Sequence, residues 1–381
     1  MSYEYDAAGR RIGMLAAGQP RVEYRYDAAD RLTRILQGGE IVQHAYDAAG
    51  RLVRTTLPND VKTGYAYNSA NELTGLAWLN PDDTLLGDLG YGYDSTGRLV
   101  AQTGSHAPQA LPAASSGANQ FDDNQRQTRF NGQSLSYDAN GNLTGDGVYT
   151  YVWNARDQLV AIEQGASTVA SFGYDAQGRR HSRTEGGQTT TYLYDGLDAV
   201  QETVGTTVNP ILTGLGIDQR HARNDSGGRT YFLTDALGST RALTDASGAV
   251  VQRYDYTPYG ETTQTASGFS NPYQYTGRER DGNGLYYYRA RYYNPGMGRF
   301  IAEDPIGLAG GLNWYAYVGG NPISYTDPLG LFEITDPGSW PLIPQSAVDF
   351  TAGWGDSLSF AGTNWIREKM GTNGAVDRCS S

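Results

Sequence analysis

Cysteine is nearly absent from this chain: Cys379 is the only one in 381 residues. No intrachain disulfide can form, and no cysteine cluster indicates a zinc site. The four histidines, His44, His106, His181 and His221, lack a second metal ligand at useful spacing. We therefore expect no metal and no cofactor, and we expect these histidines to lie on the surface.

Positive charge is also scarce. Lys and Arg number 29 against 41 Asp and Glu, which gives a formal net charge of −12. A protein that binds nucleic acid along its surface needs Lys/Arg clusters to displace counterions, and this sequence has none. We therefore expect no nucleic-acid binding by this segment.

Long apolar runs are missing too. A membrane-spanning helix needs about 20 consecutive apolar residues, and no such run occurs, so we expect no membrane span. The N-terminus shows no signal peptide, because Met1 opens directly into Ser-Tyr-Glu-Tyr-Asp. The chain is therefore expected to be made in the cytoplasm.

Glycine and tyrosine, by contrast, are abundant. The chain has 50 Gly, and 29 Tyr stand against 9 Phe. An excess of tyrosine is typical of half-exposed sheet faces, where the ring packs and the hydroxyl stays in water. These numbers favour a β-rich protein.

A repeat built on the dipeptide Tyr-Asp fills the first half of the chain. Its copies, often about 20 residues apart, are Tyr5-Asp6, Tyr26-Asp27, Tyr46-Asp47, Tyr93-Asp94, Tyr137-Asp138, Tyr174-Asp175 and Tyr194-Asp195. The fuller unit is Tyr-x-Tyr-Asp-x-x-Gly-Arg-Leu, as in residues 91–99. Since the chain opens in the middle of a unit, we expect it to be a piece of a longer array.

Each part of the unit has a local physical meaning. Tyr-x-Tyr places two rings on one face of a strand. Asp-x-x-Gly favours a type I turn, in which Asp binds backbone N–H groups and Gly tolerates positive φ. Arg-Leu then begins the return strand, so one unit is a hairpin, and hairpins must stack to be stable. The sequence predicts an all-β fold in which YD-repeat hairpins form a curved, spiralling shell, open and with an unpaired edge.

The widest gap between copies covers residues 109–127. Its residues are small and polar and cannot bury much apolar area, so we interpret it as an inserted surface loop.

After Tyr194 the regular period ends and a tyrosine-rich segment follows. Residues 284–300 read Gly-Leu-Tyr-Tyr-Tyr-Arg-Ala-Arg-Tyr-Tyr-Asn-Pro-Gly-Met-Gly-Arg-Phe. Two Asp-Pro-x-Gly-Leu segments come next, at residues 304–308 and 327–331. With these motifs the chain resembles the Rhs (rearrangement hotspot) family, YD-repeat polymorphic toxins whose relatives include the C subunits of Tc insecticidal toxins.

The resemblance implies three segments. Residues 1–200 would be the YD-repeat array, residues 201–331 the Rhs-associated core, and residues 332–381 the truncated start of a C-terminal toxin region. The core would end in a self-cleavage signature, formed here by Pro322, Asp327, Pro328, Gly330 and Leu331.

The resemblance also implies what the protein does. The shell would enclose the C-terminal toxin, and the chain would cut itself between Leu331 and Phe332 in a single-turnover reaction. The catalytic pair would be Asp304 and Asp327, assisted by Arg291. Two close carboxylates cannot both ionise easily, so one stays protonated and polarises the scissile carbonyl while the other activates water.

A plainer interpretation of these aspartates stays open. Asp, Pro and Gly at the first, second and fourth positions favour a type I turn, so Asp304 and Asp327 could each cap only their own turn.

The resemblance further implies partners and a destination. The partners would be the chain's own toxin as encapsulated cargo, a cognate immunity protein for that toxin, and secretion or toxin-complex components bound through a missing N-terminal region. The protein would be exported from a bacterium, by type VI secretion or in a Tc complex, for interbacterial competition or insecticidal delivery.

The C-terminal tail changes composition. Residues 332–344 hold three prolines and indicate an extended linker, while apolar residues from Gln345 recur every three or four positions, as in one or two short amphipathic helices. No complete catalytic constellation occurs there, so the activity of a toxin cannot be inferred from it.

Two other functions remain possible at this stage. A surface adhesin or carbohydrate-binding protein without self-cleavage could use the tyrosine-rich sheet. A conventional hydrolase on a β-propeller would need a blade period of about 40 residues, which the repeat does not show.

Overall fold

The computed structural model describes residues 1–107, 117–225, 227–265 and 271–332, and these are almost entirely β-strands and turns. All strand pairs are antiparallel and follow chain order. The first sheet has ten strands: β1 (Ser2–Tyr5), β2 (Arg11–Leu15), β3 (Val22–Tyr26), β4 (Leu32–Gln37), β5 (Glu40–Tyr46), β6 (Leu52–Thr56), β7 (Lys62–Tyr67), β8 (Leu73–Leu79), β9 (Leu85–Tyr93) and β10 (Leu99–Thr103).

A small sheet of three strands comes next: β11 (Gln120–Phe121), β12 (Gln127–Phe130) and β13 (Gln133–Ser134). The largest sheet then has fourteen strands: β14 (Ser136–Tyr137), β15 (Leu143–Gly145), β16 (Thr150–Trp153), β17 (Leu159–Gln164), β18 (Ser167–Tyr174), β19 (Arg180–Glu185), β20 (Gln188–Asp195), β21 (Asp198–Val204), β22 (Thr207–Thr213), β23 (Arg220–Asp225), β24 (Gly228–Thr234), β25 (Thr240–Thr244), β26 (Val250–Tyr256) and β27 (Thr262–Gln264). β21 contains residue 200, so pairing continues across the segment boundary expected there.

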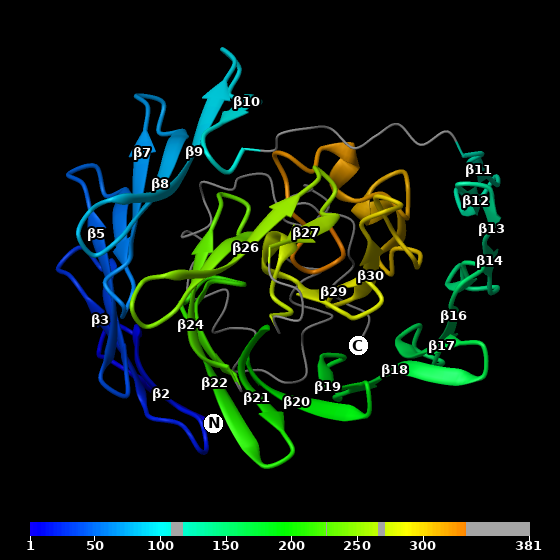
Figure 1. Cartoon of the computed structure of the whole chain (residues 1–381), viewed down its shortest axis with the longest axis horizontal. Coiled ribbons are helices and arrows are strands. Elements are labelled where there is room, and N and C mark those ends of the chain that lie inside the picture. Colours follow the sequence, from blue (N-terminus) through cyan, green and yellow to red (C-terminus); the bar gives the residue numbers. More distant parts are fainter. Residues whose placement is uncertain (108–116, 226, 266–270, 333–381) are drawn as a thin grey trace, which may run out of the picture.

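The last sheet has four short strands: β28 (Glu279–Arg280), β29 (Tyr286–Tyr288), β30 (Arg291–Asn294) and β31 (Arg299–Phe300). Three 3-10 turns accompany it: η1 (Tyr275–Gly277), η2 (Gly307–Gly310) and η3 (Val318–Gly320). In Figure 1 the strands follow a curved path around this last sheet, and the sheets are open rather than closed into a barrel. The predicted all-β, curved and open shell is therefore confirmed, and its continuous sheets differ from propeller blades.

The repeat unit forms the predicted turn. At residues 47–50, the Gly50 N–H donates to the Asp47 carbonyl at 3.0 Å, and Gly50 has a φ of 83°. The Asp47 carboxylate accepts from the Ala49 and Arg51 N–H groups, both at 2.9 Å. The Arg51 guanidinium closes back on that carboxylate at 2.7 Å. The repeat's Arg therefore holds its own turn, a role that the pattern alone did not predict.

The tyrosine before each turn joins neighbouring units. The Tyr46 hydroxyl donates to the Leu32 carbonyl at 2.8 Å, and the Arg31 guanidinium lies 4.8 Å from the centre of the Tyr46 ring. Equivalent hydroxyl bonds to the previous unit are made by Tyr26, Tyr67, Tyr93, Tyr174 and Tyr194. Each of these six units is thus bonded through a side chain to the one before it.

The curvature has a repeating source. Strand register shifts by one residue beside Tyr26, Tyr46, Tyr67, Tyr174 and Tyr194. A bulge of this kind bends a strand and increases its right-handed twist. Because the bulge recurs at the same position in each unit, the sheets curve along their length.

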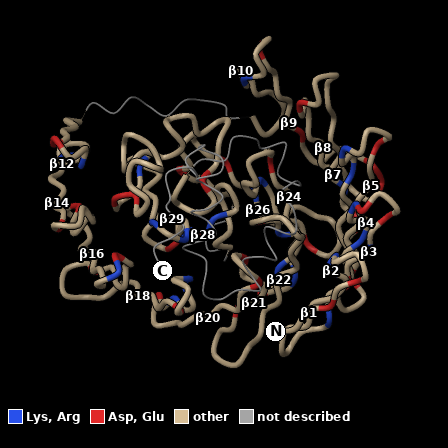
Figure 2. Tube along the Cα trace, turned by 180° about the vertical axis from the view of Figure 1, so that it is seen from behind, with Lys and Arg blue, Asp and Glu red and all other residues tan. Residues whose placement is uncertain are grey.

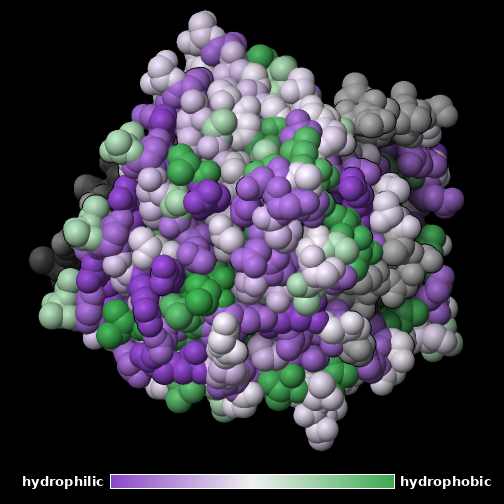
Figure 3. Space-filling view, turned by 60° about the vertical axis from the view of Figure 1, so that its left-hand side comes forward, coloured by the Kyte–Doolittle hydropathy of each residue, from purple (hydrophilic) through white to green (hydrophobic). Residues whose placement is uncertain are grey.

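The first sheet packs face to face on β21–β25 of the largest sheet. Their shared core joins residues such as Ile35, Val42 and Trp78 to Val200 and Leu212. Figure 2 shows that charged residues of both signs are interspersed along the repeat strands. Figure 3 shows that, on one face of the molecule, apolar residues are scattered among hydrophilic ones.

The surface prediction for the histidines is wrong for three of the four. His44 and His221 face each other inside the contact between the two sheets, with ring centres 5.7 Å apart. His106 is buried against Trp78, and only His181 is exposed. The repeat pattern could not show that a second sheet covers these positions.

Two further predictions need correction. The tyrosines of β29 and β30 are fully buried rather than half-exposed, and the rings of Tyr293 and Tyr317 pack at a tilt of 38° with their centres 4.4 Å apart. Within the expected insertion, residues 122–126 form another repeat-type turn, in which Arg126 binds Asp122 at 2.7 Å. Residues 108–116 and the expected helical tail lie outside the described residues.

Candidate functional site

Three charged residues from separate segments meet beside the last sheet. Arg291 begins β30, Asp304 precedes η2, and Asp327 begins the Asp-Pro-Leu-Gly turn. The Arg291 Nη2 lies 2.9 Å from Asp304 Oδ2 and 3.5 Å from Asp327 Oδ2. Each side chain is only 3% exposed. The structure therefore brings together the three residues that the sequence singled out.

Arg291 is held in place by two backbone carbonyls and an aromatic ring. Its Nε donates to the Gly330 carbonyl and its Nη1 donates to the Trp314 carbonyl at 2.9 Å. Its guanidinium carbon lies 3.6 Å from the centre of the Phe300 ring. The cation is thereby oriented with one nitrogen toward both carboxylates.

Asp327 contacts the predicted scissile peptide directly. Its Oδ1 accepts hydrogen bonds from the Leu331 N–H at 3.0 Å and from the Phe332 N–H at 3.2 Å. The Phe332 nitrogen is the amide nitrogen of the bond between Leu331 and Phe332. The Gly330 N–H also donates to the Asp327 carbonyl at 3.3 Å, so Asp327 forms its local turn as well.

Asp304 lies near the carbonyl oxygen of the same bond. A Cβ built on Gly310 would stand 2.2 Å from Asp304 Oδ2 and 2.7 Å from the Leu331 carbonyl oxygen. The two oxygens therefore lie on either side of this position, no more than 4.9 Å apart (2.2 Å plus 2.7 Å). The other carboxylate oxygen, Asp304 Oδ1, accepts from the Ile306 N–H at 3.0 Å, which is the expected turn contact.

Burial makes both carboxyl groups harder to ionise. It raises the pKa of Asp327 to about 6, against the opposing effects of Arg291 and of the two N–H donors. Burial also raises the pKa of Asp304, again opposed by Arg291. A pair in this environment can keep one proton at a pH where ordinary aspartates are ionised.

The signature residues divide into two groups. Gly330 and Leu331 contact the charged residues, since Arg291 binds the Gly330 carbonyl and Asp327 binds the Leu331 N–H. Gly330 has a φ of 67°, and a Cβ there would come within 2.3 Å of the Tyr288 carbonyl oxygen. This position therefore requires glycine. The Pro328 carbonyl accepts from Arg289. Pro322 instead lines a cavity of about 1120 Å³ whose walls include none of the three charged residues.

The structure adds residues that the sequence did not indicate. Gly310 leaves room between Asp304 and Leu331, and Arg289 holds the signature segment. Neither belongs to the recognised motif, and their roles depend on contacts between distant segments.

Among the described residues, no group of three or more His, Cys, Asp or Glu could hold a metal ion. None of their helices is long and apolar enough to cross a membrane.

Comparisons with known proteins agree with this fold. A family model described as the teneurin YD-shell matches residues 83–308, more than half of the chain, and a model of the RHS repeat matches residues 46–77. The chain is 36% identical over 216 residues to the tRNA3(Ser)-specific nuclease WapA of Bacillus spizizenii, which covers 53% of this chain and 9% of WapA. It is 29% identical over 320 residues to the double-stranded DNA deaminase toxin A of Burkholderia cenocepacia, covering 70% of this chain and 22% of that toxin.

Solved structures show the same architecture. The crystal structure of TcdB2-TccC3-Cdc42 superposes with a TM-score of 0.66 at 22% identity, over 90% of this chain and 22% of that chain. The present chain thus spans a small part of each of these proteins. The repeats, the sheets and the matching family models together show that this chain belongs to the Rhs/YD-repeat family.

Proposed function

We propose that this chain is the self-cleaving wall of a toxin shell and cuts its own backbone between Leu331 and Phe332. One observation carries the proposal: two buried carboxylates share one arginine nitrogen, one of them accepts the N–H of that peptide bond, and the other lies near its carbonyl oxygen. Holding the bond within the same chain supplies the reacting geometry in advance. We assign this step to residues 201–331, after a repeat array in residues 1–200.

The contacts suggest a division of labour. Asp304 carries the shared proton and donates it to the Leu331 carbonyl oxygen as water adds to the carbonyl carbon. Asp327 is ionised, since it accepts two N–H bonds; it removes a proton from that water and passes it to the Phe332 nitrogen as the C–N bond breaks. As that bond breaks, one hydroxyl on the former carbonyl carbon returns its proton to Asp304, which leaves the Leu331 acid and restores the shared proton. Arg291 stabilises the charge that moves between the two carboxyl groups. One water is consumed and no cofactor is needed.

The shell role rests on the relatives. Two of them are a tRNA nuclease and a DNA deaminase toxin, and one solved relative is a complex with TccC3. We propose that the segment from residue 332 is the start of such a toxin, enclosed by the shell and freed by the cut. We propose in addition that an immunity protein binds this toxin, and that the protein is exported by type VI secretion or in a Tc complex.

The glycan-binding alternative has less support. A sugar would stack on exposed tyrosine rings, but repeat tyrosines such as Tyr46 and Tyr67 use their hydroxyls in the sheet and are covered by arginines. The rings are therefore occupied within the protein.

The test is cleavage of the full chain made by cell-free translation and followed by intact-mass spectrometry. Asp304→Asn and Asp327→Asn keep size and most hydrogen bonds but remove the titrating group, so each chain should stay whole. Asp245→Asn is the matched control, because Asp245 caps a turn between β25 and β26 in the same way, away from the site. Cleavage of either site variant at the rate of the unaltered chain would overturn the proposal.

A further inference from the structure

Arg289 lies outside the proposed chemistry yet makes a dense set of contacts. It sits in the two-residue turn between β29 and β30, and its φ of 56° is unusual for a residue with a side chain. Such a conformation persists only where surrounding contacts hold it. The side chain is 10% exposed.

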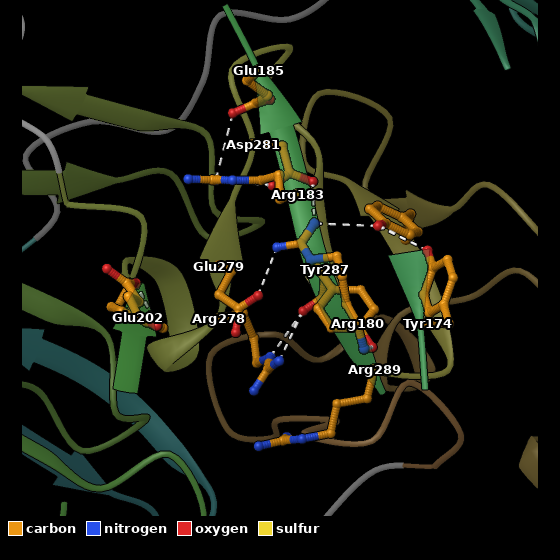
Figure 4. Close-up of polar contacts among 12 residues, drawn as sticks. Tyr174, Arg180, Arg183, Glu185, Glu202, Arg278, Glu279, Asp281, Tyr287 and Arg289 are labelled. Atoms are coloured by element: carbon orange, nitrogen blue, oxygen red, sulfur yellow. Dashed lines mark hydrogen bonds and ion pairs between the residues drawn. The ribbon is translucent and has the colours of Figure 1, made fainter. Parts of the chain in front are cut away.

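One side of the Arg289 guanidinium binds the largest sheet. It donates to the Leu197 carbonyl at 3.2 Å, to Asp198 at 3.1 Å and to Asp218 at 3.0 Å. Asp198 in turn accepts the Asp218 N–H at 2.9 Å. Figure 4 shows Arg289 at the end of a group of buried charges that includes Arg278, Glu279 and Arg180.

The other side reaches the signature segment. The Arg289 Nη1 donates to the Pro328 carbonyl, and the next residue, Ala290, donates its N–H to the Leu329 carbonyl at 3.1 Å. These two carbonyls lie between Asp327 and Gly330. The hairpin turn that carries Arg289 therefore holds the backbone that leads directly into the scissile bond.

The anchoring turn is itself tied to the first sheet. Residues 195–198 form the tight turn between β20 and β21. Asp195 at its start binds Arg11 at 2.6 Å and accepts the Tyr3 hydroxyl at 2.9 Å, and the Arg11–Asp195 pair is buried. One turn thus contacts both the N-terminal repeats and, through Arg289, the cleavage segment.

We propose that Arg289 is a positioning residue for self-cleavage: it clamps residues 328–331 to the turn at 195–198, so that cutting depends on the seating of the first sheet. This inference rests on the proposed self-cleavage but concerns different residues. Arg289 touches no reacting atom, and its effect passes through the segment that carries the scissile bond.

The first experiment measures the cleavage rate constant of the full chain, per folded molecule, across pH. Arg289→Lys keeps the positive charge but loses the planar guanidinium, whose separate nitrogens bind both the turn at 195–198 and the Pro328 carbonyl. Because small misplacements of reacting groups cost large factors in rate, we expect a fall of at least about tenfold. The shape of the pH profile should stay unchanged. Arg223→Lys is the matched control, since Arg223 binds Glu202 and Asp225 in the same sheet, and should cut at the unaltered rate.

The coupling to the first sheet has its own variant. Asp195→Asn removes the charge that Arg11 binds, and it should slow cleavage in the same direction as Arg289→Lys. Cleavage of Asp195→Asn at the unaltered rate would overturn the dependence on the first sheet. Cleavage of Arg289→Lys at that rate, or a shifted pH profile, would overturn the positioning role.

A second readout separates this inference from the proposed function. In an Asp304→Asn background, amide hydrogen exchange at Leu331 and Phe332 reports how firmly the segment is held, whether or not the chain ever cuts. Adding Arg289→Lys should speed exchange at both amides, and adding Arg223→Lys should not. Equal exchange in the two double variants would overturn the clamp. Absence of cleavage in the unaltered chain would overturn the proposed function alone.

Discussion

The two aspartates of the site differ in the backbone groups around them. Asp327 accepts the N–H groups of Leu331 and Phe332, whereas Asp304 accepts a single N–H and lies near the Leu331 oxygen. Two N–H donors favour an ionised carboxylate, and a nearby carbonyl oxygen favours a protonated one. These contacts give chemically similar residues unequal roles.

Gly310 offers a test of this geometry at one atom. Its φ is ordinary, so alanine is conformationally acceptable there, but the new Cβ would collide with Asp304 Oδ2 and the Leu331 oxygen. Gly310→Ala should therefore reduce the cleavage rate by about 100-fold, the factor that a misplacement of about 1 Å can cost. The control is Gly64→Ala, whose Cβ would lie at an ordinary 3.8 Å from its nearest neighbour. Equal rates for the two variants would contradict the assigned contact.

The raised pKa of Asp327 predicts the pH dependence of cutting. Asp327 must be ionised to take a proton from water, and burial raises its pKa to about 6. As pH falls below about 6 this carboxylate becomes protonated, so the rate constant should fall by about tenfold per pH unit on the acid side. A time course of intact mass at pH 4 to 7, expressed per folded molecule, measures it. A rate that stays level or rises as pH falls from 6 to 4 would contradict this assignment.

At the scale of the element, the hairpin unit is stabilised by contacts between consecutive units. Tyr46→Phe removes one hydroxyl bond to the Leu32 carbonyl and little else, so it should reduce the free energy of unfolding by about 0.5–1.5 kcal/mol. Urea denaturation followed by tyrosine fluorescence or circular dichroism measures it. Tyr192→Phe is the control: that hydroxyl is buried without a hydrogen-bond partner among the described residues, so its loss should cost nothing. A larger loss for Tyr192→Phe than for Tyr46→Phe would contradict the role given to the repeat tyrosine.

The hairpins could be predicted from the sequence because their chemistry is local. The Asp47 turn involves five consecutive residues, and each residue type has a preference that the pattern reveals. The Arg-to-Asp closure and the hydroxyl bond to the previous unit were missed, since several arrangements satisfy the same spacing. The three charged site residues were found only through family motifs, whereas Gly310 and Arg289 act through contacts that no motif records.

At the scale of the whole molecule, the sequence could not show which sheets pack against each other. His44 and His221 are far apart in the chain, yet both are buried in the contact between the first and largest sheets. Alternating patterns show that a strand has a buried face but do not identify what covers it. The same limit explains why the buried pair Arg11–Asp195 was not expected.

The buried histidines predict a loss of stability in acid. Burial lowers the pKa of His44 to about 4, and burial with the nearby His44 lowers the pKa of His221 to about 3. The unfolded chain binds protons at about pH 6.5, so stability is present above that pH and is lost as pH falls from 6.5 toward 4. His221→Gln should lose less stability over this interval, and His181→Gln, at an exposed position, should behave like the unaltered chain. Thermal denaturation at pH 7 and pH 4.5 measures it; equal acid sensitivity of His221→Gln and the unaltered chain would contradict the account.

The most direct test of self-cleavage is the N-terminal sequence of the smaller fragment that the full chain releases. We predict a new N-terminus at Phe332, together with a larger fragment that ends at Leu331. A fragment that begins at any other residue, or a chain that stays whole, would contradict the assignment of Asp304, Asp327 and Arg291 to this bond.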